Sequence, residues 1–248
     1  METTHIESAE AGYRIALPLH REREAAGWRP LGRKIGFTNR SLWPRYGVFQ
    51  PIFGFVYDRT LTHATEGRAT VSLAGLKQPR IEPEICFGLK AAPPRSKDPA
   101  EILPAIEWVA HSIEIVHCDL PNWQMKVGDA TSANGLHGAL VVGRKVPIAA
   151  FADAADRLRA LEVTLSKAGT IVDRGTGANV LDSPLLALAH LVDLLATLPD
   201  FAQLSAGEVI TTGTLTDAAP IAPGETWSTR FKGDELPGLN IHFTADSL

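Results

Sequence analysis

Two carboxylates lie inside an apolar, strand-forming run in the segment RIEPEICFGLK, residues 80–90. Successive side chains of a β-strand point to opposite faces, so Glu82 and Glu84 share one face. Burying two ionised carboxylates side by side is costly unless something compensates their charge. The segment therefore predicts either a strand face that is open to water or a pair of acids held by a cation.

A third carboxylate, Glu114, lies in the β-branched run SIEIVH at residues 112–117. If the two strands are neighbours, Glu82, Glu84 and Glu114 converge and supply three oxygen ligands of the kind that Mg²⁺ or Mn²⁺ prefers. Zinc and copper would prefer nitrogen or sulfur, and no His/Cys cluster stands beside these acids at a metal-ligand spacing. On strand spacing alone, a half-solvated sheet face remains the alternative.

Composition narrows the class of protein. With 248 residues and 45% hydrophobic content, the chain can form one large domain or a domain with a small appendage. Its 24 basic and 28 acidic residues give a net charge of −4, and the scattered basic residues argue against nucleic acid as a partner. No uninterrupted apolar run approaches the length of a membrane span, and the first twenty residues lack the pattern of a signal peptide. Cys86 and Cys118 indicate reduced core residues of a cytoplasmic protein, with a buried disulfide as the alternative.

The order of elements favours an α+β or mixed β architecture over a regular β-α-β alternation. Helical spacing predicts a helix over residues 7–27 with an interruption near Pro18, an amphipathic helix over 98–111 and a helix over 183–198. Short β-prone segments fill most of the rest. The long polar stretch between them, residues 119–138, is typical of a functional loop. The predicted strands are 32–39, 48–61, 70–73, 81–89, 112–117, 139–143, 161–169, 209–213, 226–231 and 239–243.

Six segments, in consistent order, resemble the 2-oxopent-4-enoate hydratase and 4-oxalocrotonate decarboxylase family of the fumarylacetoacetate hydrolase superfamily. They are GRKIG (32–36), QPIFG (50–54), RIEPEICF (80–87), SIEIV (112–116), DRGTGANVLDSPLLALAHLV (173–192) and LSAGEVITTG (204–213). The resemblance implies a mixed β-roll with flanking helices over residues 31–248, after an N-terminal helical segment at 1–30. It also implies Mg²⁺ or Mn²⁺, small 2-oxo acid substrates of aromatic catabolism, and a homo-oligomer.

The resemblance also assigns roles to residues. The family's paired carboxylate ligands fall on Glu82 and Glu84, its third ligand on Glu114, and its active-site lysine on Lys34 in GRKIG. Without the resemblance, a lone lysine after a loop glycine would be read as a solvated surface residue. Asn134 and the turn at 211–213, with Thr212 at its centre, would lie near the substrate.

Two departures from the family pattern alter the surroundings of the pocket. Hydratases of this family usually carry an aspartate, thought to help move protons, where this chain has Ile52. The family's common Asp-Ser-Arg after the third ligand is replaced by His-Cys-Asp at 117–119. His137 or Asp119 could serve as the proton shuttle instead; an ordinary loop histidine and a turn or capping aspartate are the alternatives.

The sequence also suggests roles for three further residues. Arg174 could attract a second substrate carboxylate or form a structural salt bridge at its turn. His117 alternates away from Glu114 on an ideal strand, which favours a core histidine, or one that supports a ligand, over a ligand itself. Glu107 is expected to be solvated on the predicted 98–111 helix.

Together these observations predict a cytoplasmic, Mg²⁺- or Mn²⁺-dependent lyase of the hydratase type acting on a small 2-oxo acid or its enol. A 2-oxo acid decarboxylase or C–C bond hydrolase of the same superfamily is the alternative, because one enolate-stabilising site can serve all three reactions. From another class of function, a non-catalytic subunit that binds a catalytic relative is a third hypothesis.

Overall fold

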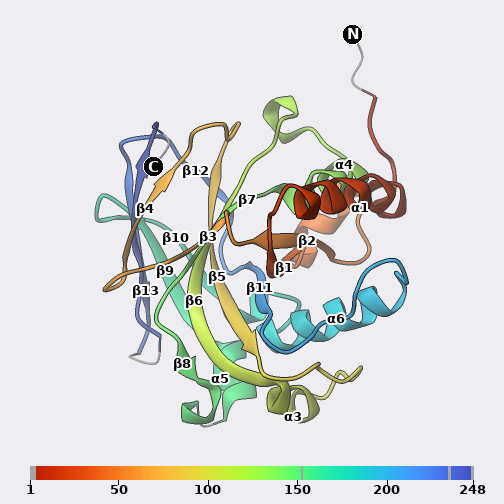
Figure 1. Ribbon diagram of the computed structural model, residues 1–248. Coiled ribbons are helices and arrows are strands. Elements are labelled where there is room, and N and C mark those ends of the chain that lie inside the picture. The colour runs from red at the N-terminus through yellow and green to blue at the C-terminus, as the bar shows by residue number, and fades with distance from the viewer. Residues whose placement is uncertain (1–3, 152, 234–235, 247–248) are drawn as a thin grey trace.

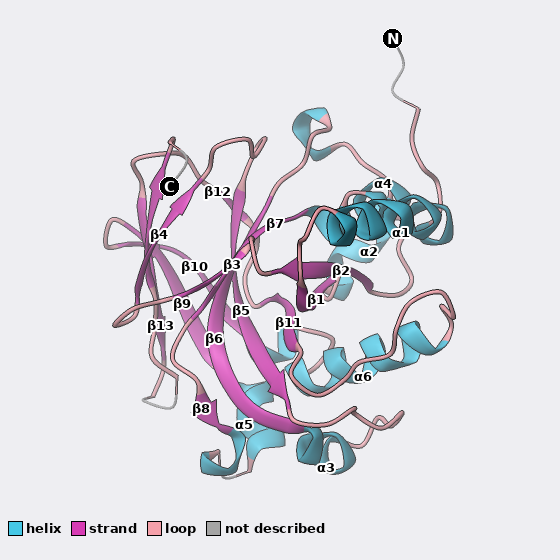
Figure 2. Ribbon diagram, in the orientation of Figure 1, coloured by secondary structure: helices cyan, strands magenta, loops and turns pink. Residues whose placement is uncertain are grey.

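The structure is a computed structural model that describes residues 4–151, 153–233 and 236–246. Two curled β-sheets pack against each other, and helices lie around the larger sheet on the side away from the smaller one and at one end (Figures 1 and 2). The expected α+β β-roll with flanking helices is confirmed. The division into residues 1–30 and 31–248 stays a prediction, and the N-terminal helix contributes Tyr13 to the main hydrophobic core.

The larger sheet has nine strands in the order β2-β1-β11-β5-β6-β7-β3, with β12 paired to β5 and β8 paired to β6. These strands are β1 (Pro30–Gly36), β2 (Ile52–Tyr57), β3 (Leu61–His63), β5 (Arg80–Leu89), β6 (Ile106–Val116), β7 (His137–Val142), β8 (Val146–Pro147), β11 (Val209–Thr214) and β12 (Ala219–Pro220). The smaller sheet has the order β10-β9-β13-β14-β4. Its strands are β4 (Arg68–Ser72), β9 (Glu162–Lys167), β10 (Thr170–Thr176), β13 (Thr226–Phe231) and β14 (Asn240–Thr244).

The described α-helices are mostly short. They are α1 (Ala9–Ala25), α2 (Trp43–Tyr46), α3 (Pro99–Ile102), α4 (Val127–Ser132), α5 (Ala154–Ala160) and α6 (Pro184–Ala196). Ser183 caps α6 by accepting a hydrogen bond from the Leu185 backbone N–H at 3.3 Å, and Pro184 occupies the first turn, where its missing N–H costs nothing. Residues 177–196, which include α6, are long and apolar enough to cross a membrane, but 67% of their most apolar stretch is buried inside the fold, as in a core helix.

The long strands β5 and β6 form the centre of the larger sheet, and their antiparallel register pairs Glu82 with Glu114 and Glu84 with Ser112. Alternate residues on the other face of the same strands, Ile81, Ile113 and Ile115 among them, pack in a hydrophobic core against the smaller sheet. The β5–β6 pair therefore has one face that carries the buried carboxylates and an opposite, apolar face that packs against the smaller sheet.

Three sequence-based expectations about elements are wrong in detail. The 98–111 segment is helical only to Ile102, followed by a 3₁₀ turn at 103–105, and β6 begins at Ile106 because its backbone pairs with β5. Glu107 is exposed, but on a strand. Helix α1 runs through Pro18 without a break. The 119–138 stretch is not wholly a loop, since it contains α4.

Candidate metal and substrate site

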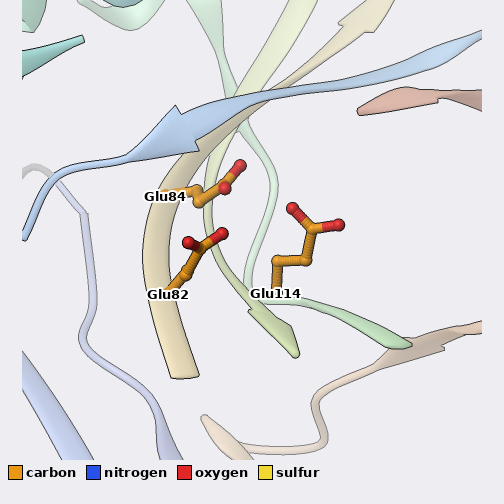
Figure 3. A group of neighbouring side chains, drawn as sticks. All are labelled: Glu82, Glu84 and Glu114. Atoms are coloured by element: carbon orange, nitrogen blue, oxygen red, sulfur yellow. The ribbon is translucent and has the colours of Figure 1, made fainter. Parts of the chain in front are cut away.

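Three carboxylates converge on the inner face of the larger sheet. Glu82 and Glu84 project from β5 and Glu114 from the neighbouring strand β6, and the three side chains point toward a common space (Figure 3). One carboxylate oxygen from each lies within 4.8 Å of those of the other two. Glu84 and Glu114 are fully buried and Glu82 is partly exposed. The structure thus brings together the three acids that the sequence singled out.

Glu84 is fixed by the neighbouring strand β11. Its Oε2 accepts hydrogen bonds from the Thr211 hydroxyl and, at 2.9 Å, from the Gly213 backbone N–H, while its buried Oε1 has no hydrogen-bond partner. Gly213 has a φ of +100°, and a Cβ there would meet Thr38 Oγ1 at 1.9 Å, so only glycine fits this bulge. One oxygen of Glu84 is therefore held in place, and the other remains available to a ligand.

Glu114 is held by a lysine and a histidine. Lys34 Nζ lies 3.2 Å from Glu114 Oε2 and donates to the Gly135 carbonyl at 2.9 Å. His137 Nδ1 lies 2.7 Å from Glu114 Oε1, and its Nε2 lies 2.9 Å from Thr60 Oγ1. The His137 side chain is 1% exposed, so it supports Glu114 from inside the protein.

Three carboxylates lie close together here, and the single ammonium of Lys34 cannot balance three negative charges. Burial raises the pKa of Glu82 to about 7, although Lys34 opposes the shift. Burial, reinforced by Glu114 and Glu82, raises the pKa of Glu84 well above its ordinary value. Burial would also raise the pKa of Glu114, but Lys34 and His137 outweigh it and the pKa falls. Burial would lower the pKa of Lys34, yet the attraction of the three carboxylates raises it. The geometry and charge of the site thus fit a bound cation.

A cavity of about 100 Å³ opens beside the carboxylates. Its polar lining includes Lys34, Glu82 and Arg80. Most of the remaining wall is apolar, and its hydrophobic side chains are Ile35, Phe37, Ile52, Val116, Trp123, Met125, Leu136 and Ala218. A small acid with an apolar middle would match this lining.

Ile52, the residue at the family's aspartate position, is 1% exposed and lines the cavity. Asn134 binds the backbone of β2 instead: its Oδ1 accepts from the Phe55 N–H at 2.7 Å and its Nδ2 donates to the Phe55 carbonyl at 2.9 Å. Thr212 is buried and donates to the Ile85 carbonyl at 2.9 Å. Neither Asn134 nor Thr212 lines the cavity, but each adjoins a glycine that does, at 135 and 213.

The remaining candidates lie outside the cavity lining. Arg174 is exposed on β10, and exposed Asp119 lies 3.6 Å from Lys77 Nζ. His117 is partly exposed. His137 contacts a carboxylate of the site without reaching the cavity.

Several contacts of the site were not foreseen from the sequence. Thr60 and Gly135 each bind one of the site's side chains, but both are distant in sequence from their partners. Thr211 belongs to the 211–213 turn that the sequence placed near the substrate, but its hydrogen bond to Glu84 was not foreseen. Arg80 carried a local signal, because it precedes Glu82 by two positions on the same strand and therefore shares its face.

Comparison with known proteins agrees with this geometry. Residues 48–239 match the family described as fumarylacetoacetate (FAA) hydrolase C-terminal. The chain is 34% identical to 2-hydroxyhexa-2,4-dienoate hydratase of Comamonas testosteroni, covering 96% of this chain and 87% of the relative. It is 30% identical to 4-oxalocrotonate decarboxylase of Pseudomonas sp. strain CF600, and that match covers 89% of this chain and 81% of the relative.

Among solved structures, 4-oxalocrotonate decarboxylase from Pseudomonas putida G7, complexed with magnesium and adipate, superposes with a TM-score of 0.85 at 28% identity. The match covers 95% of this chain and 86% of that one. The sequence match, the fold and the relatives agree, and the chain belongs to the fumarylacetoacetate hydrolase family, within the group that contains the dienoate hydratases and 4-oxalocrotonate decarboxylases.

Proposed function

We propose that this protein is a divalent-metal-dependent lyase of the hydratase type that acts on a small 2-oxo acid or its enol. The convergence of Glu82, Glu84 and Glu114 within 4.8 Å, beside a buried lysine and a cavity, carries the proposal. The hydratase that is 34% identical over 96% of the chain supports the reaction class, and the magnesium complex of the decarboxylase supports the cation.

The three glutamates would hold the cation, and Mg²⁺ or Mn²⁺ is the choice that an all-carboxylate donor set favours. When bound, the cation supplies Lewis-acid stabilisation of the negative charge that develops on the substrate's keto oxygen. The free Oε1 of Glu84 supports this fit, since a buried carboxylate oxygen without a partner is costly.

The chain's own residues would perform the remaining work. Lys34 has its ammonium at the inner end of the cavity, held by Glu114 and the Gly135 carbonyl, where it can give a proton to the substrate or take one from it. The apolar wall around Ile52 and Leu136 excludes water from the chain of the substrate. His137 keeps Glu114 oriented from behind.

Decarboxylation of a 2-oxo acid is the second candidate, and one observation favours it. Ile52 places an apolar side chain in the cavity wall, where the related hydratases usually have an aspartate that handles protons. A reaction that releases CO₂ does not need a base to activate water. A hydrolytic C–C cleavage would need such a base, so Ile52 gives it less support.

Calorimetry with Mn²⁺ tests the metal site directly. Wild-type protein is expected to bind Mn²⁺, and oxalate, which resembles a 2-oxo acid enolate, is expected to tighten that binding. Glu82→Gln keeps the shape of the side chain but removes its charge, and it should lose both effects. Wild-type protein that fails to bind Mn²⁺ would refute the proposal.

Turnover separates an enzyme from a non-catalytic subunit. The purified protein alone should convert 2-oxo-4-enoate substrates, and Mn²⁺ should stimulate the reaction. Product analysis distinguishes water addition from CO₂ release. A protein that binds Mn²⁺ yet shows no turnover alone, and gains it only with an added catalytic relative, would support the subunit hypothesis instead.

A further inference from the structure

The Arg80 guanidinium is half-buried and lines the cavity beside the carboxylates. Along β5, the side chains on this face run outward from fully buried Glu84 through partly exposed Glu82 to Arg80. Arg80 Cζ lies 4.1 Å from the centroid of the Trp123 ring, which also lines the cavity. Within residues 4–151, 153–233 and 236–246, the guanidinium has no hydrogen bond and no ion pair with a carboxylate, although its charge opposes the rise that burial causes in the pKa of Glu82, two positions along the strand. A cation in this position has the capacity to bind an anion.

The Trp123 ring is held in place by a strained and well-bonded turn. Asn122 and Trp123 have φ values of 56° and 58°, in the left-handed region that residues other than glycine rarely adopt. Gln78 ties the turn down: its side chain donates to the Cys118 and Leu120 carbonyls at 2.8 and 2.7 Å and accepts from the Asn122 N–H at 2.8 Å. The Gln78 carbonyl accepts from Trp123 Nε1 at 3.1 Å. Strain of this kind persists where surrounding contacts impose it, and it is concentrated at binding sites.

The substrate would cross the cavity from the carboxylates to this guanidinium. In the proposed function, on which this inference rests, the carboxylate and keto oxygens of the 2-oxo acid would bind the cation that the three glutamates hold. The rest of the molecule then passes between apolar walls that include Ile52, Val116 and Leu136. Among the described residues Arg80 is the only arginine that lines this cavity, whereas Arg174, the arginine that the sequence suggested for a second carboxylate, is exposed elsewhere.

We propose that Arg80, stacked on Trp123, binds a second carboxylate of the substrate, so that the natural substrate is a 2-oxo dicarboxylic acid rather than a 2-oxo monocarboxylic acid. Stacking occupies the face of the guanidinium and leaves its N–H edge free, and that edge matches both oxygens of a carboxylate. The pairing gives specificity as well as affinity, because a substrate without the second carboxylate leaves the partly buried cation unpaired.

Two ligands of equal length test the proposal: 2-oxoadipate and 2-oxohexanoate are both six-carbon 2-oxo acids, and only 2-oxoadipate has a second carboxylate, at C6. Calorimetry on the Mn²⁺-loaded wild type should show a preference for 2-oxoadipate of about tenfold to a hundredfold. Arg80→Met keeps the apolar stem of the side chain and should abolish the preference, so that the two acids bind with affinities within about twofold of each other. Arg80→Lys should keep part of the preference for 2-oxoadipate, because the ammonium keeps the positive charge but cannot bind both carboxylate oxygens as a guanidinium does.

Two further variants complete the design. Trp123→Leu removes the ring beneath the guanidinium and should reduce the preference for 2-oxoadipate without abolishing it. Cooperative thermal unfolding of this variant checks that it is folded. Arg144→Met, which removes an exposed arginine outside the cavity lining, should leave both affinities unchanged.

The outcomes separate this inference from the proposed function. If wild-type protein binds Mn²⁺ and both acids equally well, the second-carboxylate site is refuted while the metal site stands. If Arg80→Met weakens both acids to the same extent, Arg80 contacts the 2-oxo acid end and the dicarboxylate assignment is wrong. If the wild type does not bind Mn²⁺, the proposed function fails and this inference with it.

Discussion

The two faces of the antiparallel pair β5–β6 differ in chemistry, although the same two strands form both. Alternate residues on the inner face include Glu82, Glu84 and Glu114, which lie beside a cavity, with Glu84 and Glu114 fully buried. On the outer face, Ile113 and Ile115 are 1% and 0% exposed and pack against the smaller sheet. Burying the outer face stabilises the fold, and burying the carboxylates opposes folding unless a cation is bound.

This difference teaches where stability and function reside. A sheet with two buried faces can place a costly polar cluster on one of them because the apolar contacts of the other offset the cost. Substitutions on the inner face should therefore change binding and turnover, and substitutions on the outer face should change the free energy of unfolding. The substitutions below test whether binding and stability can be changed independently.

The largest expected effect is on turnover when Lys34 is replaced. Lys34→Met removes the ammonium at the inner end of the cavity, and loss of a proton-transfer residue should reduce turnover about 10²- to 10⁴-fold. Mn²⁺ binding, measured by calorimetry, should be retained, because Lys34 is not a ligand. Lys77→Met, at a surface lysine beside Asp119, is the matched control and should keep full activity. Unchanged turnover in Lys34→Met would remove Lys34 from the mechanism.

The sequence anticipated the inner face better than it anticipated the elements around it. Two-residue spacing on β-branched strands was enough to place Glu82, Glu84 and Glu114 on one side, because the period of a strand is fixed by its backbone. The predicted 98–111 helix failed because Ile102, Ile106 and Val109 also fit a helical period, and pairing with β5 decided the outcome from Ile106 onward.

Long-range contacts carried no local signal in the sequence. His137 meets Glu114 only because β6 and β7 are adjacent, and Lys34 meets Gly135 only because β1 lies beside the turn before β7. Arg174 seemed suited to a second carboxylate from its turn, but β10 is an edge strand of the smaller sheet and leaves it exposed. Pattern reasoning predicts the face on which a residue lies, and chain topology determines which residues meet there.

On the outer face, Ile113→Ala should destabilise the fold without affecting the metal site. Truncation of this 1%-exposed side chain leaves a cavity between the sheets and should cost about 2–5 kcal/mol in the free energy of unfolding. Urea unfolding measures the loss, and Mn²⁺ affinity should not change. Ile171→Ala makes the same truncation on a side chain that is 48% exposed and should cost no more than about 0.5 kcal/mol. A large loss of Mn²⁺ affinity in Ile113→Ala would show that the two faces are coupled.

Buried His111, on the outer face, should make the free energy of unfolding depend on pH. Its Nδ1 lies 2.9 Å from the Glu84 carbonyl oxygen and its Nε2 lies 2.7 Å from Thr229 Oγ1, and burial lowers its pKa to about 4. The unfolded chain binds a proton at this residue below about pH 6.5, whereas the folded protein does not until about pH 4, so stability falls as the pH drops through that window. The loss should reach about 3 kcal/mol relative to His111→Gln, which cannot titrate. Equal pH slopes for wild type and variant in urea unfolding would contradict this.

The smallest effect concerns the support behind Glu114. His137→Ala removes the imidazole that holds Glu114 Oε1 at 2.7 Å and should weaken Mn²⁺ binding by about tenfold to a hundredfold, because an unsupported ligand carboxylate must be ordered when the cation binds. Thr60→Val, which breaks only the outer contact at His137 Nε2, should have a smaller effect in the same direction, and Thr60→Ser should restore wild-type affinity. Calorimetry on all three variants gives the comparison. If His137→Ala is as stable as the wild type and binds Mn²⁺ equally tightly, the histidine belongs to the packing of the hairpin and not to the function of its inner face.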